Sequence, residues 1–455
     1  MSPSAASNGG PLHEGLDWLS VEGFKSHFQE SRIEFPGLTI LCGANSSGKS
    51  SAMQPLLLLK QTFDSLPYDY GPLRLDGPNV FFNHVDQMLA TRPGLKAPRI
   101  VLQLGYRVWP MRWTEVQPGI AEHTRDPMVE GQTRIEFTAD RPGVKLAKTT
   151  YTRDGESLVL EANTPSGALP AAFRTGLVAY PAEWTATREL RRTGSLLQLS
   201  SGQPEEEPVL LQRELRQLLH LSGLRGQPER HYPRVQLETQ GMHAQGLFHI
   251  QAPSWVAHWT AHDKPQLERF QAALGQLGLT WKVQARQRDA ASIEIMVGRS
   301  PRPQQGGAHD LVNIADVGFG VSQSLPVAVA LVGGQPGQLI YIEQPEIHLH
   351  PRAHAAMADL IADAVNRSCK VVIETHSDTL LRRVQTLIAR GTLAREKVIA
   401  HWFSRGGRGE TKITTVVPEV DGSLGEWPED FSEVDEEIDR DYADAAFARL
   451  KAVGT

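Results

Sequence analysis

One short segment constrains this chain more than any other: it matches the pattern G-x-x-x-x-G-K-[ST] and reads Gly43-Ala44-Asn45-Ser46-Ser47-Gly48-Lys49-Ser50. An apolar run, LTILC, comes directly before it, and helical apolar spacing follows from Ser51 to about Asp64. A strand, a glycine-rich loop and a helix in this order form the context that a phosphate-binding loop requires. The alternative, a flexible Gly-Ser linker, does not explain the flanking strand and helix.

Each fixed residue of the loop has a physical role in holding phosphate. Backbone N–H groups of residues 45–50 form an anion-binding nest at a helix N-terminus, and we include Ser51 in the binding segment. Lys49 neutralises the charge of the β- and γ-phosphates, and the Ser50 hydroxyl ligates Mg²⁺. The predicted ligands are therefore ATP and Mg²⁺.

Two later strands end in polar residues that complete such a site. The run LIYIE ends at Glu343, which we predict to be the carboxylate that holds Mg²⁺. The run VVIET leads into His376, a candidate to bond the γ-phosphate or the attacking water. Taken alone, Glu343 fits a surface residue after a buried strand, and His376 fits an ordinary core or surface histidine. Their occurrence together with Lys49 favours the functional interpretation.

Three motifs together resemble the ATP-binding-cassette (ABC) ATPases of the SMC and RecF type: GANSSGKS with Asn45, the strand ending in EQPEIHLHP, and ETHSD. In that family a phosphate loop, a magnesium strand, an HLHP-like turn and a switch histidine recur in this order. The resemblance is specific over 37–65 and 310–380. It implies an α/β fold: a P-loop NTPase head of the ABC-ATPase type with a mixed sheet, plus an inserted α+β lobe.

The family also needs a signature helix, and the segment DVGFGVSQ upstream of Glu343 is similar to it. By this resemblance Gly320 and Ser322 reach across a homodimer to the γ-phosphate bound by the other subunit. On local sequence alone, a glycine-rich loop capped by a serine is an equal alternative.

One departure from the family pattern concerns turnover. The usual Asp-Glu pair at the magnesium strand is Glu343-Gln344 here, and an amide cannot take a proton. Gln344 can still orient water, and Glu346 on the same turn can serve as the base. We therefore expect ATP binding with slow hydrolysis, and we assign Gln344, Glu346 and His376 as the catalytic residues.

The pattern of elements divides the chain into five predicted parts. They are a disordered tail (1–15), the N-terminal part of the head (16–98), an inserted β-rich and helical lobe (99–300), the C-terminal part of the head (301–395) and an extension with an acidic tail (396–455). Helices are predicted over 206–223 and 265–278, each ending at a glycine. Strand and helix alternate in the final third, which is typical of a parallel sheet covered on both faces.

Composition excludes several classes of protein. No apolar run approaches the roughly 18 to 20 residues that span a membrane, and the N-terminus lacks a secretory signal, so we expect a cytoplasmic location. Lys and Arg number 46 against 52 acidic residues, so bulk charge gives no evidence for nucleic acid, although a local basic patch is compatible with it. Two cysteines, Cys42 and Cys369, are too few for a disulfide framework and are expected in the core.

The expected activity is that of an ATP-dependent switch that closes as a homodimer around ATP, senses DNA or recruits a separate effector, for example a nuclease. The compact insert and the GEWPEDF segment most resemble single-chain bacterial ABC-like ATPases, several of which accompany anti-phage defence operons, the Septu ATPase being one relative. OLD nucleases share such a head, but 377–455 is too short for their Toprim domain. The alternative function is an ATP-bound scaffold with little turnover.

Three weaker features are set aside. Leu221-Ser222-Gly223 echoes a transporter-type signature but is expected to end a helix. Arg225 and Arg230 are candidates for phosphate or DNA contacts, although unimportant surface arginines are the favoured interpretation. His348 and His350 are expected to line the dimer interface and not to bind metal.

Overall fold

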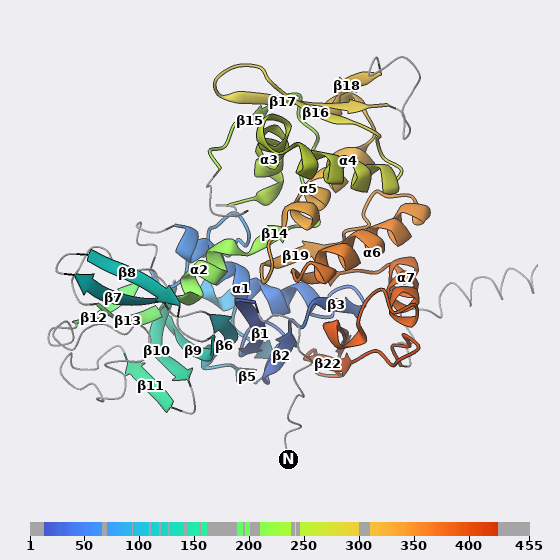
Figure 1. Cartoon of the computed structure of the whole chain (residues 1–455). Helices are drawn as coiled ribbons and strands as arrows, with labels where there is room; N and C mark the ends of the chain where they lie inside the picture. The colour runs from blue at the N-terminus through green and yellow to red at the C-terminus, as the bar shows by residue number, and fades with distance from the viewer. Residues whose placement is uncertain are drawn as a thin grey trace, which may run out of the picture.

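The computed structural model describes most of the chain, namely residues 13–65, 71–92, 94–108, 111–117, 120–125, 128–140, 143–153, 156–161, 189–193, 196–200, 210–237, 242, 246–299 and 310–425. Figure 1 shows a central region of strands and helices, an antiparallel sheet to one side and a further lobe above it. The acidic segment predicted after residue 425 and the first twelve residues lie outside the described part.

A six-stranded sheet forms the centre of the molecule. Its order is β14 (Leu219–Leu221), β19 (Leu339–Glu343), β20 (Lys370–Glu374), β3 (Leu38–Gly43), β21 (Val398–Arg405) and β22 (Thr411–Val416). The first five strands are parallel, and β22 returns antiparallel to β21. The chain therefore builds the mixed α/β head that its final third predicts, and the predicted fold class is confirmed.

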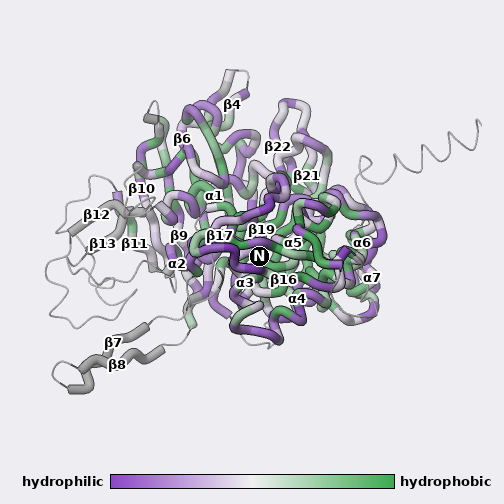
Figure 2. Tube along the Cα trace, turned by 90° about the horizontal axis from the view of Figure 1, so that it is seen from above, coloured by the Kyte–Doolittle hydropathy of each residue, from purple (hydrophilic) through white to green (hydrophobic). Residues whose placement is uncertain are grey.

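Helices cover both faces of this sheet (Figure 1). They are α1 (Lys49–Asp64), which follows β3, and α5 (Phe319–Gly333), α6 (Pro351–Asn366) and α7 (Asp378–Ala389). Alternate residues of β3 point to opposite faces: Ile40 belongs to the core under α5 to α7, and Leu41 to the core that contains α1. Figure 2 shows hydrophobic residues concentrated around α5 near the centre of the molecule. An almost entirely apolar helix such as α5 is stable only when buried on all sides.

The second sheet is antiparallel and packs over α1. Its order is β11 (Glu156–Glu161), β10 (Gly143–Arg153), β9 (Val129–Asp140), β6 (Arg99–Val108), β1 (Gly15–Glu22) and β2 (Ser31–Glu34). Because β6 pairs with β1 from Gly15 to Glu22, the domain boundary predicted between 98 and 99 falls inside one hydrogen-bonded sheet. The strand β1 also begins at Gly15, the last residue of the predicted tail.

A lobe above the head joins two helices to a small sheet. The helices are α3 (Phe248–His262) and α4 (Lys264–Gln276), and the strands are β15 (Tyr232–Pro233), β16 (Val283–Gln287), β17 (Ser292–Gly298) and β18 (Leu311–Asn313). The remaining elements are the hairpins β4 (Thr91–Arg92) with β5 (Leu95–Lys96), β7 (Met111–Gln117) with β8 (Ile120–Arg125), and β12 (Glu189–Thr193) with β13 (Leu196–Ser200), the helix α2 (Leu210–Gln217), and 3-10 turns at Val85–Gln87, Ile314–Asp316 and Arg395–Lys397.

The prediction of one helix over 206–223 is wrong in its second half. The helix α2 ends at Gln217, and Leu219–Leu221 form the strand β14 beside β19. Apolar residues that continue a helical period also fit a short buried strand, and the free edge of β19 decides between the two. The helix predicted over 265–278 is confirmed as α4.

The two cysteines lie where their number and position predict. Cys42 and Cys369 are both buried and unpaired, as expected for core residues. Across the described ranges, no helix combines the length and the apolar composition needed to cross a membrane.

Candidate nucleotide-binding site

The loop between β3 and α1 has the backbone conformation of a phosphate cradle. Ser46 and Gly48 have positive φ angles of 61° and 108°, and α1 begins at Lys49. Only glycine fits at position 48, because a Cβ atom there would collide with the Thr411 hydroxyl. The Lys49 ammonium group curls back over the loop and donates to the carbonyl oxygens of Gly43 at 2.8 Å and Ala44 at 2.9 Å. The charge thus lies over the cradle.

A hairpin from the C-terminal part of the chain braces this loop. The Thr411 hydroxyl on β22 donates to the Ser47 carbonyl at 2.9 Å and accepts from the Ser26 hydroxyl at 2.7 Å. Arg405 at the end of β21 donates from Nε to the Ser46 carbonyl at 2.7 Å. Residues more than 350 positions away in the sequence therefore fix the backbone of the loop. The domain boundary predicted between 395 and 396 comes just before β21. Because β21 pairs with β3, the strand that leads into the loop, the segment after this boundary is part of the same sheet.

We predict that Thr411→Val weakens nucleotide binding about fivefold and lowers the free energy of unfolding by about 1 kcal/mol, because the Ser47 carbonyl loses its donor. Titration calorimetry and urea unfolding measure the two effects. Thr414→Val is the matched control, because Thr414 lies exposed on the same strand. Equal affinities for both variants would contradict the brace.

His27 supports the loop from the opposite side. Its ring is buried, and Nε2 lies 3.3 Å from the Gly48 carbonyl while Nδ1 lies 2.9 Å from the Ser31 hydroxyl. Burial lowers the pKa of His27 to about 4, although the bond to Gly48 opposes the shift. The ring is therefore neutral at pH 7. Because a carbonyl only accepts, the proton is on Nε2, and Ser31 donates to Nδ1.

Glu374, at the end of β20, is the carboxyl group that meets the phosphate loop. Ser50 donates to its Oε2 at 2.8 Å, and the Tyr341 hydroxyl donates to its Oε1. The sequence analysis places Glu343 beside Ser50, but β20 lies between β3 and β19, so Glu374 is the nearer carboxylate. Burial raises the pKa of Glu374 to about 7, an effect that the Tyr341 and Ser50 hydrogen bonds oppose.

The raised pKa of Glu374 predicts a pH dependence of stability. Its ordinary value is 4.5, so between about pH 4.5 and 7 the folded protein holds a proton that the unfolded chain has lost. The nucleotide-free protein is therefore expected to lose on the order of 3 kcal/mol of stability across this window as the pH rises. Urea unfolding at pH 5, 6, 7 and 8 measures it. Glu374→Gln should flatten this slope, and an unchanged slope in that variant would contradict the assignment.

Glu343 is held in a separate set of contacts. His220 on β14 lies 3.2 Å from Oε1, and the Gly223 N–H donates to Oε2 at 3.0 Å. Burial raises the pKa of Glu343, but His220, Gly223 and the charge of Arg225 outweigh it and the net shift is downward. Glu343 is therefore ionised at neutral pH. Its role as a metal ligand remains a prediction, with Glu374 beside it in register on the next strand.

The turn after β19 carries the other predicted catalytic residues. Gln344 has a positive φ of 46°, and its N–H donates to the Glu374 carbonyl at 2.8 Å. Glu346 Oε1 accepts from the Thr375 hydroxyl at 2.6 Å and from the His376 N–H at 3.2 Å. Burial and then the charge of Lys49 lower the pKa of His376. The structure thus gathers these residues at one edge of the sheet.

The predicted signature residues lie at the start of α5, next to the turn that follows β19. Ser322 is in the first turn of α5 and donates to the Phe319 carbonyl at 2.9 Å. Gly320 approaches the His348 carbonyl, and a Cβ atom there would lie 3.1 Å from that oxygen. Phe319 is 48% exposed and contacts the His348 ring with centroids 5.9 Å apart. The start of α5 and the turn at His348 therefore share one exposed surface.

Sequence reasoning missed several residues of the site. Glu374 had a signal, because it ends a strand as Glu343 does, but only His376 was assigned there. Arg225 is 4% exposed, so its interpretation as a surface residue is wrong. Arg230 is exposed, as expected, and it pairs with Asp316. The segment around Gly223 follows a strand and contacts Glu343, so it does not end a helix. Thr411 and His27 had no local signal.

The residues present fit a hard divalent cation. Ser50 offers a hydroxyl, and Glu374 and Glu343 offer carboxylates at the ends of adjacent parallel strands. Magnesium prefers such oxygen ligands and completes its shell with water and phosphate. Over the ranges that the structure describes, no three His, Cys, Asp or Glu side chains form a ready metal cluster. Phosphate oxygens would therefore supply part of the coordination.

Comparison with protein families gives one match. A family described as "AAA domain, putative AbiEii toxin, Type IV TA system" matches residues 287–382. This range includes α5, β19 and β20, and so contains Ser322, Glu343, Glu346 and His376. No curated protein matches the chain.

Solved structures with similarity include SMC head domains. The SMC head bound to the C-terminal winged-helix domain of ScpA is 14% identical, with a TM-score of 0.47 over 89% of this chain and 98% of that chain. The SMC head domain from Thermotoga maritima is 13% identical, with a TM-score of 0.40 over 88% and 99%. An SMC head with an extended coiled coil, bound to the C-terminal domain of ScpA from Pyrococcus furiosus, is 12% identical, with a TM-score of 0.46 over 89% and 97%.

Proposed function

We propose that this protein is an ATPase that binds ATP with Mg²⁺ on the loop from Gly43 to Ser51. One observation carries the proposal: the Lys49 ammonium group lies over a loop with left-handed residues at 46 and 48, and Ser50 beside it is bonded to Glu374. A cation, a nest of backbone N–H groups and a hydroxyl next to a carboxylate are what a triphosphate with a metal ion requires.

The chain's own residues divide the work. The Lys49 ammonium group is already in place, because it is bonded to the carbonyl oxygens of Gly43 and Ala44. When ATP binds, Lys49 exchanges these two bonds for bonds to phosphate oxygens. Glu346 takes the proton of the attacking water, with Oε1 held by Thr375 and the His376 N–H. Gln344 orients that water. Bound Mg²⁺ supplies charge neutralisation on the phosphate oxygens, and Ser50, Glu374 and Glu343 are the residues that would hold it.

A second copy of the chain completes the site in this proposal. Ser322 and Gly320 at the start of α5 are half-buried, and in this proposal they meet the nucleotide bound by a partner. The exposed Phe319 next to them supplies apolar surface for such a contact. Size-exclusion chromatography with a slowly hydrolysed ATP analogue tests the homodimer, and a particle that stays monomeric at saturating nucleotide would contradict it.

The proposed biological role is a switch that senses DNA or recruits a separate effector, with a nuclease as the example, in anti-phage defence or DNA repair. The lobe formed by α3, α4 and β15 to β18 packs against α5 through its two helices. Closure of a dimer at the start of α5 would therefore move this lobe. Such a role fits a cytoplasmic protein. Pull-down of the ATP-locked protein, followed by nuclease assays on the captured complex, tests the effector.

The alternative is a scaffold in which ATP is a structural ligand with little turnover. Gln344 favours it, because an amide replaces the carboxylate expected at that position and cannot accept the proton of water. Single-turnover measurement separates the two functions: bound ATP that survives for hours supports the scaffold, and release of phosphate within minutes supports the ATPase.

A further inference from the structure

The loop after β14 carries a buried arginine that the proposed mechanism does not use. Arg225 is 4% exposed, and its Nη2 donates to the Glu343 carbonyl at 2.5 Å and to the Gln344 carbonyl at 3.1 Å. Burial lowers the pKa of Arg225 to about 10, although the charges of Glu346 and Glu343 oppose the shift, so it stays positive at pH 7. Burial of a charge carries a desolvation penalty in free energy, and an apolar residue would fill the same space without that penalty.

The two carbonyls that Arg225 contacts belong to a strained turn. Gln344 has a φ of 46°, a left-handed conformation that is unfavourable for a non-glycine residue and persists only where neighbours hold it. Its N–H is held by the Glu374 carbonyl, and its own carbonyl is held by Arg225. The peptide groups on both sides of Gln344 are therefore fixed, and the turn leads directly to Glu346.

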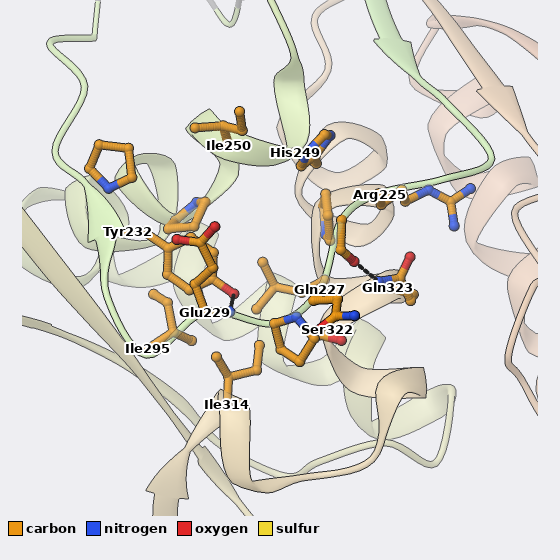
Figure 3. Close-up of a pocket in the computed structure, with 16 residues that line it drawn as sticks. Arg225, Gln227, Glu229, Tyr232, His249, Ile250, Ile295, Ile314, Ser322 and Gln323 are labelled. Atoms are coloured by element: carbon orange, nitrogen blue, oxygen red, sulfur yellow. Dashed lines mark hydrogen bonds between the residues drawn. The ribbon is translucent and has the colours of Figure 1, made fainter.

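The same loop is bonded to α5. The Gln323 side chain is 4% exposed and donates from Nε2 to the Gly226 carbonyl at 2.7 Å. Gly226 follows Arg225, and Gln323 follows Ser322, the residue predicted to reach a partner's nucleotide. Figure 3 shows the Gln323 bond at the edge of a cavity of about 290 Å³, with the Arg225 side chain directed away from the cavity. The Gln323 hydrogen bond, the peptide link from Gly226 to Arg225 and the two Arg225 hydrogen bonds thus join the start of α5 to the turn.

We propose that Arg225 is a positioning residue that ties the start of α5 to the turn carrying Gln344 and Glu346. When two subunits close around nucleotide, a movement of α5 is transmitted through Gly226 and Arg225 to the turn at 344–349, which we call the hydrolytic turn. The inference rests on the proposed ATPase function for its catalytic consequence. Its structural part, the tie itself, is present in the nucleotide-free protein.

The donor geometry supports an arginine and not merely a cation. One guanidinium nitrogen reaches two successive carbonyls, and its Nε and Nη1 have no hydrogen-bond partner among the described residues. The Oε2 atom of Glu346 is likewise buried without a partner there. A lysine keeps the charge, but its side chain is one atom shorter than that of arginine, so its ammonium group falls short of the place where Nη2 meets both carbonyls. Charge-preserving replacement therefore separates positioning from electrostatics.

The test compares Arg225→Lys, Gln323→Ala and the control Arg230→Lys, whose side chain is exposed. ATP affinity is measured by calorimetry, turnover by phosphate release, and hydrogen exchange over 319–324 and 344–349 by mass spectrometry without nucleotide. We expect Arg225→Lys to lower kcat about 10- to 100-fold with Kd for ATP within about twofold, and exchange to rise at least about fivefold in the turn at 344–349. Gln323→Ala should raise exchange at both segments with a smaller loss of kcat.

The outcomes are distinguishable. Exchange at 344–349 that is unchanged in both Arg225→Lys and Gln323→Ala overturns the tie, whatever the activity. If the unaltered protein binds no ATP, the proposed function fails, while the exchange measurement still decides the tie. If it binds ATP without hydrolysis, the scaffold alternative holds and exchange again decides. If Arg225→Lys lowers kcat no more than the control Arg230→Lys does, the proposed effect of Arg225 on hydrolysis is rejected. Thermal unfolding above 40 °C for Arg225→Lys confirms that the variant is folded, and Gln323→Ala serves if it is not.

Discussion

Lys49→Ala is expected to weaken ATP binding at least about 100-fold. Lys49 is 6% exposed, and its ammonium group already lies over the phosphate cradle, bonded to the carbonyl oxygens of Gly43 and Ala44. Charge-assisted hydrogen bonds to phosphate are about twice as strong as neutral ones, and two of them account for roughly 3 kcal/mol, or about a factor of 100. Calorimetric titration with ATP and Mg²⁺ measures the change.

Two controls accompany this variant. Lys264→Ala removes a side chain that is 84% exposed and pairs with Glu268 on the surface of α4, so ATP affinity should not change. Lys49→Ala also removes the donor to two loop carbonyls, so urea unfolding must show that the variant is folded. Affinity within threefold of the unaltered protein would reject the phosphate-binding role of the loop.

Glu346→Gln is expected to lower kcat by about 10² to 10³ with little change in ATP affinity. The carboxylate lies on the hydrolytic turn with Oε1 fixed by Thr375 and the His376 N–H, and a general base of this kind contributes about 10² to 10⁴ in rate. Glutamine keeps an acceptor for both hydrogen bonds, so the turn should keep its shape while losing the ability to take a proton. Phosphate release at saturating ATP measures kcat.

The control for this variant is Glu396→Gln, an exposed glutamate in the turn before β21. Its kcat should equal that of the unaltered protein. If Glu346→Gln hydrolyses ATP at the normal rate, the base lies elsewhere. Glu343→Gln then becomes the next variant to measure, because Glu343 ends the strand before this turn and its pKa is lowered by His220, Gly223 and Arg225.

The phosphate loop could be located from the sequence because its function depends on local chemistry. The backbone of a tight loop between a strand and a helix needs glycine at fixed positions, and phosphate needs Lys49 and Ser50 directly beside it. The strands ending at Glu343 and Glu374 were likewise visible as apolar runs. For the same reason the alternation of strand and helix predicted the parallel sheet.

The strand order could not be predicted, and it decides which carboxylate meets the loop. Apolar runs show that β19 and β20 are buried strands but not that β20 lies next to β3. Glu374 is therefore the partner of Ser50. Glu343 instead contacts His220, which lies on β14, a strand within the segment predicted to be helical. Long-range pairing depends on which edges remain free after the rest of the chain has packed.

The sequence by itself determined the phosphate loop, the chemistry of the two later strands that end in polar residues, and the α/β class, because each depends on residues close together in the chain. Only the tertiary structure decided that Thr411 and Arg405 brace the loop and that Arg225 is buried under the turn at Gln344. The burial of a charged side chain is set by what packs over it. That covering comes from residues more than a hundred positions away, whose approach no local pattern encodes.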